Sequence, residues 1–173
     1  VPSVTSAGAA ANASVAGSPY LVDVAVGTLN ALNGYQLALV DGSLTVDPLV
    51  AVLAGTRVYD ATQTISGGDL SVSNLVAGDS VGLTGSGTLV SKNVGDQAIT
   101  DFGSLVLSSG NYTLGGATGS VAITPATLTV DATAQDKIYD GTTLATVNLL
   151  DDRFAGDLLT LSFANASFAD RNA

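Results

Sequence analysis

The side chains that could carry chemistry in this chain are aspartates, tyrosines and a few cations. All 15 acidic residues are aspartates, five residues are tyrosines, and neither histidine nor cysteine occurs. Without His and Cys, the chain lacks the usual general base, the thiol nucleophile and the preferred transition-metal ligands. Ser91 precedes Lys92, but adjacent residues of a strand point to opposite faces, which is poor geometry for proton transfer. We therefore expect no enzymatic activity.

Two Tyr-Asp pairs, Tyr59-Asp60 and Tyr139-Asp140, stand in similar surroundings. A β-branched residue precedes each Tyr, and a small residue (Ala61 or Gly141) and then Thr follow each Asp. A functional role would make the pair a ligand contact displayed once per unit. A structural role would have Tyr fill the apolar end of a unit while Asp bonds backbone amides of the following turn. Recurrence of the pair favours the structural interpretation.

Two further tyrosines lie beside turn dipeptides. Tyr35 follows Asn33-Gly34, and Tyr112 follows Gly110-Asn111. Because Asn and Gly both tolerate positive φ, Asn33-Gly34 predicts a hairpin between the segments that flank it. We expect Tyr35 and Tyr112 to pack in the same way at the ends of their units.

Aspartate clusters are the candidates for a metal site, because Ca²⁺ prefers oxygen ligands. The closest groupings are Asp151-Asp152 with Asp157, and Asp136 with Asp140. There is no D-x-D-x-D-G spacing and no Glu for bidentate binding. We therefore expect solvated turn aspartates and no cofactor, with calcium as the alternative.

Charge and hydropathy exclude several classes of partner. The net charge is −10, and the five cations are scattered (Arg57, Lys92, Lys137, Arg153 and Arg171). No basic patch exists to bind nucleic acid. The longest apolar run, residues 49–54, is too short to cross a bilayer, so we expect no membrane insertion. The two lysines are not at equivalent repeat positions, which disfavours an isopeptide cross-link.

Four independent matches indicate an internal repeat. The separations are 139 − 59 = 80 for the Tyr-Asp pairs, 156 − 78 = 78 for the Ala-Gly-Asp segments, 171 − 92 = 79 for the Lys92 and Arg171 segments, and 112 − 35 = 77 for Tyr35 and Tyr112. A period of about 78 residues predicts that 1–48 is the C-terminal part of one repeat, 49–125 a complete repeat, and 126–173 the N-terminal part of another. No signal peptide is visible, and the chain reads as a piece of something longer.

Apolar residues alternate with polar ones inside each repeat, for example at Tyr35, Leu37 and Leu39. A period of two, with 20 glycines and no Glu, indicates short strands joined by tight turns. We predict an all-β fold of tandem, elongated β-sandwich-like modules with six to eight strands each. A β-grasp-like module is the alternative and would need a helix. We expect a strand break at Pro125 and a loop or edge strand over 6–18, with a short helix as the lesser option there.

Longer stretches resemble a known group of repeats. "KIYDGTTLATV" followed by "FAGDLLTLSFANASFADRNA" resembles the YDG-type repeat of very large bacterial surface adhesins, and residues 18–48 are similar to the closing half of the related MBG-type repeat. The middle copy departs from the pattern with Ala61 in place of Gly. Because Ala resists positive φ, either that turn differs or Gly is not essential in it.

The resemblance implies a filamentous-haemagglutinin-like adhesin of a Gram-negative bacterium, secreted and held at the cell surface. Its repeats would form a stalk or multivalent display array in attachment, aggregation or biofilm formation. Partners would be neighbouring repeats, cell-surface glycans, matrix polysaccharide or other adhesin copies. A carbohydrate-binding module with an exposed Tyr in each repeat is the alternative. Burial of both Tyr59 and Tyr139 would remove the main support for such a sugar site.

Overall fold

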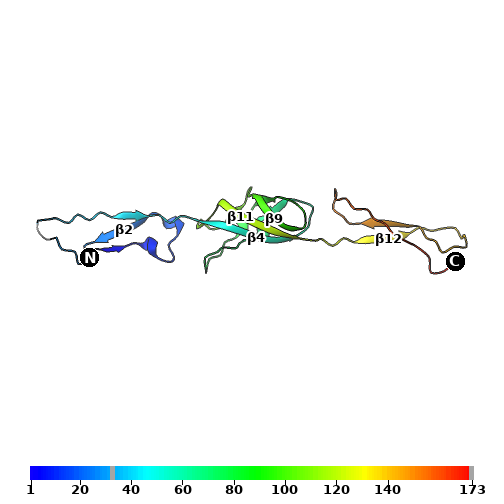
Figure 1. Ribbon diagram of the computed structural model, residues 1–173, viewed down its shortest axis with the longest axis horizontal. Helices are drawn as coiled ribbons and strands as arrows, with labels where there is room; N and C mark the ends of the chain where they lie inside the picture. Colours follow the sequence, from blue (N-terminus) through cyan, green and yellow to red (C-terminus); the bar gives the residue numbers. More distant parts are fainter. Residues whose placement is uncertain (32–33, 172–173) are drawn as a thin grey trace.

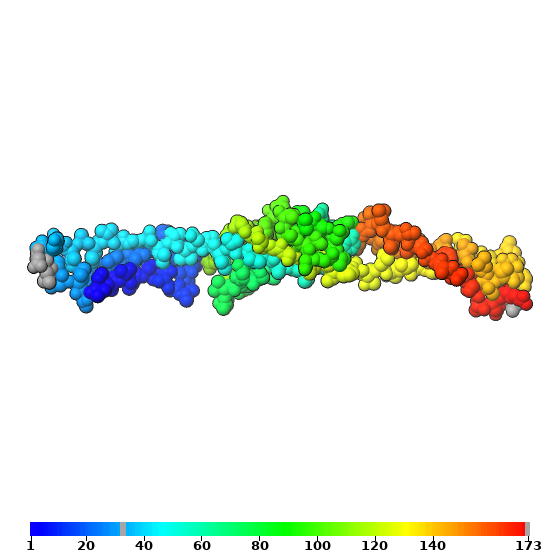
Figure 2. Space-filling model, viewed as in Figure 1, coloured from blue at the N-terminus to red at the C-terminus, as the bar shows by residue number. Residues whose placement is uncertain are grey.

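The structure, a computed structural model, describes residues 1–31 and 34–171. It is elongated, with three strand-built parts in one line and the two ends of the chain far apart (Figures 1 and 2). We call residues 1–48 the N-terminal unit, 49–124 the central unit and 126–171 the C-terminal unit. In the described part of the chain, no helix is long and apolar enough to cross a membrane.

The central unit contains eight strands and one 3-10 turn. Their bounds are β4 Leu49–Val58, β5 Thr64–Ser66, η3 Gly67–Asp69, β6 Leu70–Val72, β7 Leu83–Thr84, β8 Ser86–Leu89, β9 Gly95–Asp101, β10 Val106–Leu107 and β11 Tyr112–Thr124. Six of the strands form one sheet in the order β5-β8-β9-β11-β4-β6, and β10 pairs with β7. The two edge strands, β5 and β6, are joined by η3 alone. A sheet whose two edges are connected by so short a link must curl, and this one does.

The centre of this sheet is β11, which has different neighbours on its two sides. It runs parallel to β4, with pairs from Tyr112↔Leu49 to Thr124↔Val58, and antiparallel to β9. A parallel pair cannot be closed by a tight hairpin, and here the rest of the unit forms the connection. Gly119 of β11 has no space for a side chain, because a Cβ there would lie 2.8 Å from the Cβ and the carbonyl oxygen of Leu53.

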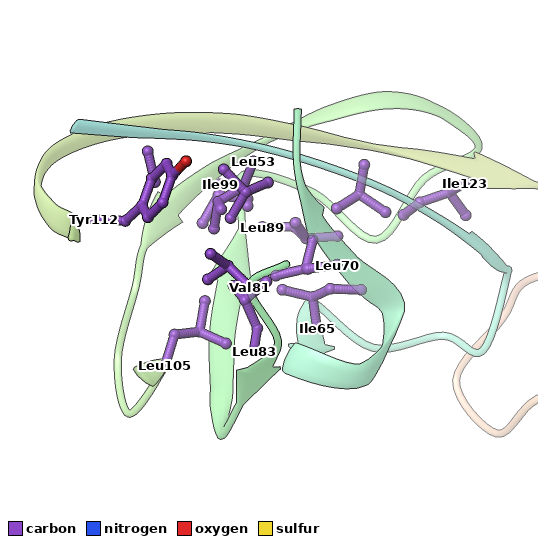
Figure 3. Packing of buried hydrophobic residues seen from close by; sticks show 13 residues of the cluster. Leu53, Ile65, Leu70, Val81, Leu83, Leu89, Ile99, Leu105, Tyr112 and Ile123 are labelled. Atoms are coloured by element: carbon purple, nitrogen blue, oxygen red, sulfur yellow. The ribbon is translucent and has the colours of Figure 1, made fainter. Parts of the chain in front are cut away.

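The concave side of the curled sheet holds the core of the molecule (Figure 3). Inward residues of β4, such as Ala51 and Leu53, alternate with exposed ones, as the period of two predicts. The buried members are Ala51, Leu53, Ile65, Leu70, Val72, Val81, Leu83, Leu89, Ile99, Leu105, Tyr112, Val121 and Ile123. All of them belong to the central unit, and none is charged.

The two outer units are open sheets. The N-terminal unit has β1 Ser3–Thr5, η1 Ala7–Ala9, η2 Val15–Gly17, β2 Tyr20–Ala25 and β3 Gly42–Leu44, and the C-terminal unit has β12 Val130–Ala134 and β13 Val147–Asp151. The strands pair antiparallel in the orders β1-β2-β3 and β12-β13. No described residue of either unit is buried as a whole, although the side chain of Asp151 is 3% exposed beside Arg153. These units therefore have strands without a core.

Strand registers recur between the units. In the central unit Ala98 of β9 pairs with Ser120 of β11, and in the N-terminal unit Leu21 of β2 pairs with Ser43 of β3. The separations are 98 − 21 = 77 and 120 − 43 = 77. Leu53↔Val72 joins β4 to β6, and Val130↔Asp151 joins β12 to β13; the separations of 130 − 53 = 77 and 151 − 72 = 79 show that this second register is shifted by two residues.

The all-β prediction is confirmed, but the details differ. The central unit has one strongly curled six-stranded sheet and the two-stranded sheet of β10 and β7, where two packed sheets were expected. Helical backbone in the described residues is limited to three 3-10 turns, so the helix of a β-grasp module is not found there. The strand break at Pro125 is confirmed, since β11 ends at Thr124 and β12 begins at Val130.

The N-terminal unit differs from its predicted strand pattern. Residues 6–18 form a loop that holds the turns η1 and η2, and the edge strand β1 lies just before it. Residues 34–41 form no strand, so the strand expected from their alternation is wrong. Among the described residues, none forms a parallel partner beside them as β4 does beside β11. In the predicted Asn33-Gly34 hairpin, Asn33 lies outside the described residues, and Gly34 has a φ of 86°.

Candidate functional site

The first Tyr-Asp pair opens a tight turn closed by its own carboxylate. Asp60 Oδ1 accepts hydrogen bonds from the backbone N and the Oγ1 of Thr62, both at 2.9 Å. Arg57, whose side chain is 8% exposed, donates from Nη1 to Asp60 Oδ2 at 2.6 Å and to the Thr64 carbonyl at 2.8 Å. Partial burial acts to raise the pKa of Asp60, but the Thr62 hydrogen bonds and the Arg57 charge outweigh it and lower that pKa.

The second pair repeats this geometry in the C-terminal unit. Asp140 Oδ1 accepts from the backbone N and the Oγ1 of Thr142 at 2.9 Å, and Lys137 takes the place of Arg57, with its Nζ 2.9 Å from the carboxylate. The Lys137 bond, followed by the Thr142 bonds, lowers the pKa of Asp140 to about 2. Each carboxylate is thus engaged by its own turn.

The residue after each Asp has left-handed backbone. Ala61 has a φ of 63° and Gly141 a φ of 74°. The turn with Ala therefore does not differ from the turn with Gly. Because the Cβ of an L-residue is strained at positive φ, Ala61 occupies a position that suits glycine.

Tyr59 joins the central unit to the C-terminal unit. Its Oη donates to the carboxylate of Asp157, 2.7 Å from Oδ1 and 2.8 Å from Oδ2, and the Nζ of Lys92 lies 2.8 Å from the same Oδ1. The ring of Phe154 meets the Tyr59 ring edge-on, at 5.7 Å between centroids and 74° between planes. We call these four residues, Tyr59, Lys92, Phe154 and Asp157, the junction clasp.

The junction clasp keeps its charges at neutral pH. Hydrogen bonds from Lys92 and then Tyr59 lower the pKa of Asp157, and the bond to Asp157 is the main cause that raises the pKa of Lys92 and of Tyr59. The Lys92 amine points to Asp157, while the hydroxyl of Ser91 accepts from the backbone N of Asn93 at 3.1 Å. The arrangement holds two units together and leaves the Lys92 amine protonated.

The other tyrosines differ in their burial and in their hydrogen bonds. Tyr112 is 5% exposed, and its Oη donates to Asp79 at 2.6 Å and accepts from the Val76 N at 2.9 Å. Tyr35, expected to pack like Tyr112, is 80% exposed, so that expectation is wrong. The physical reason is that, in the described part of the chain, no strand or loop covers Tyr35 as β4 and the 76–79 loop cover Tyr112. Tyr139 is 66% exposed, whereas Tyr59 is half-buried against the core.

The candidate calcium ligands do not form a cluster. Asp151 accepts from Arg153 Nε at 2.6 Å, Asp152 accepts from the Thr129 N at 2.8 Å, and Asp157 belongs to the junction clasp. Across the described residues, no group of three or more His, Cys, Asp or Glu side chains is placed to hold a metal ion. Asp140, Asp151, Asp152 and Asp157 instead bind cations, amides and a tyrosine hydroxyl of the chain.

Reasoning from the sequence alone missed the carboxylate partners of the buried and half-buried tyrosines. Asp79 binds Tyr112, and Asp157 binds Tyr59. A signal was present, because Asp79 and Asp157 follow Ala-Gly in matching segments whose glycines are 156 − 78 = 78 positions apart. A comparison of the repeats for hydrogen-bond acceptors as well as for tyrosines would have identified both aspartates.

Fold and site together define an all-β protein of strand-built units, in which a tyrosine–carboxylate contact joins the central unit to the C-terminal unit. The model of the YDG domain matches residues 42–120 and residues 124–173, so the chain belongs to the YDG domain family. No curated protein and no solved structure gives a significant match.

Proposed function

We propose that this chain is a structural segment of an extracellular bacterial adhesin, where tandem units act as a stalk or a multivalent display array. The observation that carries the proposal is the recurrence of geometry along one line. The strand register of β2 and β3 recurs in β9 and β11, and the Asp-Thr turn at Asp60 recurs at Asp140. The units follow one another end to end (Figure 1).

In this proposal the repeat found in the sequence is the building unit. Residues 49–125 are one complete repeat, 1–48 the closing part of the preceding one and 126–173 the opening part of the next. The family match supports YDG-type repeats. A linear series of such units can extend far from its point of attachment. Many weak contacts, one or more per unit, together give a high avidity. Secretion, surface attachment and a role in aggregation or biofilm belong to the proposal through the resemblance to large adhesins.

Added repeats test the building-unit part of the proposal. Chains with one, two or three further copies of residues 49–125, inserted after residue 125, should grow in maximum dimension by equal steps in small-angle X-ray scattering. A compact fold would grow only with about the cube root of its mass. A maximum dimension that grows only with the cube root of the mass would contradict a stalk-like arrangement of the units.

The adhesive part needs a separate measurement. Beads coated with the chain at increasing density should retain bacterial cells or matrix polysaccharide steeply as density rises, because each contact is weak and their number decides retention. Retention that is absent at every density would leave the chain as a spacer without adhesive contacts.

Carbohydrate binding is the second candidate, and one observation favours it. The exposed ring of Tyr139 borders a surface cavity of about 370 Å³ that Lys137 and Phe168 also line. An aromatic face beside polar groups suits a sugar ring. A glycan array would test this candidate: saturable binding to a defined sugar, lost in Tyr139→Ala and kept in Tyr35→Ala, would establish it. Tyr59 also borders a cavity, of about 350 Å³, but its ring is half-buried and already contacts Phe154 at 5.7 Å and the Lys92 Nζ at 5.9 Å between centres.

A further inference from the structure

The turn that carries Asp157 in the junction clasp occurs a second time, inside the central unit. Each turn is closed by the amide of its aspartate, which donates to the carbonyl three positions earlier, at 3.0 Å in residues 76–79 and at 3.1 Å in residues 154–157. Gly78 and Gly156 both have left-handed backbone, with φ of 95° and 92°. The acceptor side of the clasp is therefore one structure found twice, 156 − 78 = 78 positions apart.

The donor side of the clasp also recurs. Tyr59 and Lys92 lie together at the end of the central unit that faces Asp157, with the Lys92 Nζ 5.9 Å from the centre of the Tyr59 ring. Their counterparts are Tyr139 (139 − 59 = 80) and Arg171 (171 − 92 = 79), and both border one cavity of the C-terminal unit. A phenol beside a cation thus marks the same place in two successive units.

The corresponding segments meet at the junction that precedes the central unit. Val15 lies 92 − 15 = 77 positions before Lys92. It borders a cavity of about 300 Å³ together with Val76 and Asp79. The segment around Val15 therefore faces the turn of Asp79 as the segment around Lys92 faces the turn of Asp157. The two junctions of the chain share one arrangement.

Asp79 has an oxygen atom available for a contact of the clasp type. Its Oδ2 accepts from the Tyr112 Oη at 2.6 Å, and among the described residues no hydrogen-bond donor reaches its Oδ1. In the clasp, the Oδ1 of Asp157 accepts from both Lys92 and Tyr59. Because a carboxylate has about four lone-pair sites, Asp79 can bind Tyr112 of its own unit and two further donors.

We propose that the junction clasp is the general joint between consecutive units: where one complete unit follows another, Tyr59 and Lys92 of the first bind Asp79 of the second. The Tyr59 ring would pack on Val76, which takes the place of Phe154. This inference rests on the repeats of the proposed function and names the contact that joins them. Each joint would connect the end of one unit to the core of the next, because Asp79 already binds the core of its own unit.

A chain with one further copy of residues 49–125, inserted after residue 125, contains this joint between two complete units. A water-soluble carbodiimide tests it, because it activates a carboxylate, a neighbouring amine displaces a urea, and an amide bond forms without a spacer. The original chain should give a Lys92–Asp157 link, since these groups lie 2.8 Å apart. The longer chain should also give a link between Lys92 of the first copy and Asp79 of the second.

Lys92→Arg identifies the copy that reacts, because a guanidinium keeps the positive charge but forms no such amide. In the first copy it should abolish the Lys92–Asp79 link and leave the Lys92–Asp157 link, and in the second copy it should do the reverse. The Lys137–Asp140 pair, 2.9 Å apart, should react equally in every variant and is the internal standard. Mass spectrometry of proteolytic fragments measures all three links.

Tyr59→Leu tests the aromatic part of the joint. In the first copy this substitution should shift the NMR signals of the Val76 methyl groups in the second copy, because a ring that packs on a methyl group changes its chemical shift. The same substitution in the second copy is the matched control, and it should leave those Val76 signals in place.

Three outcomes would overturn the inference. They are a longer chain that forms no Lys92–Asp79 link, a Lys92–Asp79 link that survives Lys92→Arg in the first copy, and Val76 signals that Tyr59→Leu in the first copy leaves unchanged. The second would place the link inside one copy. Equal length steps in scattering for added copies, without this link, would reject the inference alone, whereas unequal steps would reject the repeats on which it rests.

Discussion

Ala61 holds a left-handed backbone that its methyl group opposes, at the position where the second turn has Gly141. We expect Ala61→Gly to stabilise the central unit by about 1 kcal/mol, because glycine adopts this φ without strain. Thermal or urea unfolding measures the change. Ala77→Gly is the matched control at an exposed loop position without positive φ, and it should be neutral or slightly destabilising. A destabilised Ala61→Gly would contradict the turn geometry.

The carboxylate of Asp157 titrates as part of the junction clasp. Its pKa lies below the ordinary 3.8, chiefly because of Lys92 and then Tyr59. A carboxyl with a lowered folded pKa contributes stability above its unfolded pKa and loses it as pH falls through the folded pKa. We therefore expect the contact between the central and C-terminal units to hold at about pH 5 and to weaken progressively below about pH 4.

Carboxyl-detected NMR can follow Asp157 directly. Lys92→Ala should raise the pKa of Asp157 more than Tyr59→Phe does, because the Lys92 bond is the larger cause of the shift. Asp60, held by Arg57 and Thr62, is the control, and its titration should not move in either variant. An unchanged Asp157 titration in Lys92→Ala would show that the two side chains do not meet in solution.

At the scale of strands, Gly119 and Gly42 are equivalent positions 77 residues apart, but Gly119 is tightly packed and Gly42 is open. Gly119→Ala should destabilise the central unit by about 1–3 kcal/mol, because its Cβ would press on Leu53 and Ile99. Gly42→Ala should be neutral or stabilising by about 0.4–1 kcal/mol, because its place is open and Ala restricts the unfolded chain. Equal effects of the two substitutions in unfolding experiments would contradict the difference in packing.

The sequence was sufficient for the all-β class, because alternation and glycine placement are local signals, although the strand expected over 34–41 does not form. It identified the Tyr-Asp turns but not the curl of the sheet. That curl depends on β5 and β6 becoming the two edges of one sheet, which is a matter of non-local pairing. The same cause explains Tyr35 and Tyr112. Their local sequences are alike, and only the presence of β4 and the 76–79 loop buries one of them.

The candidate site was predictable only in part for a similar reason. Asp60 and Asp140 bond residues two positions away, so their turns follow from local sequence. The junction clasp joins Tyr59 to Asp157 across 98 positions. No local sequence pattern predicts a contact between residues so far apart. Only the internal repeat of about 78 residues could have suggested it.

At the scale of the whole molecule, the central claim is that the chain is a line of strand-built units and not one globule. Small-angle X-ray scattering of the chain at low concentration tests it. A compact fold of 173 residues has a radius of gyration of about 16 Å. The account predicts a clearly larger value, with scattering in the intermediate range that follows a rod. A radius equal to that of the compact fold, with the profile of a sphere, would contradict it.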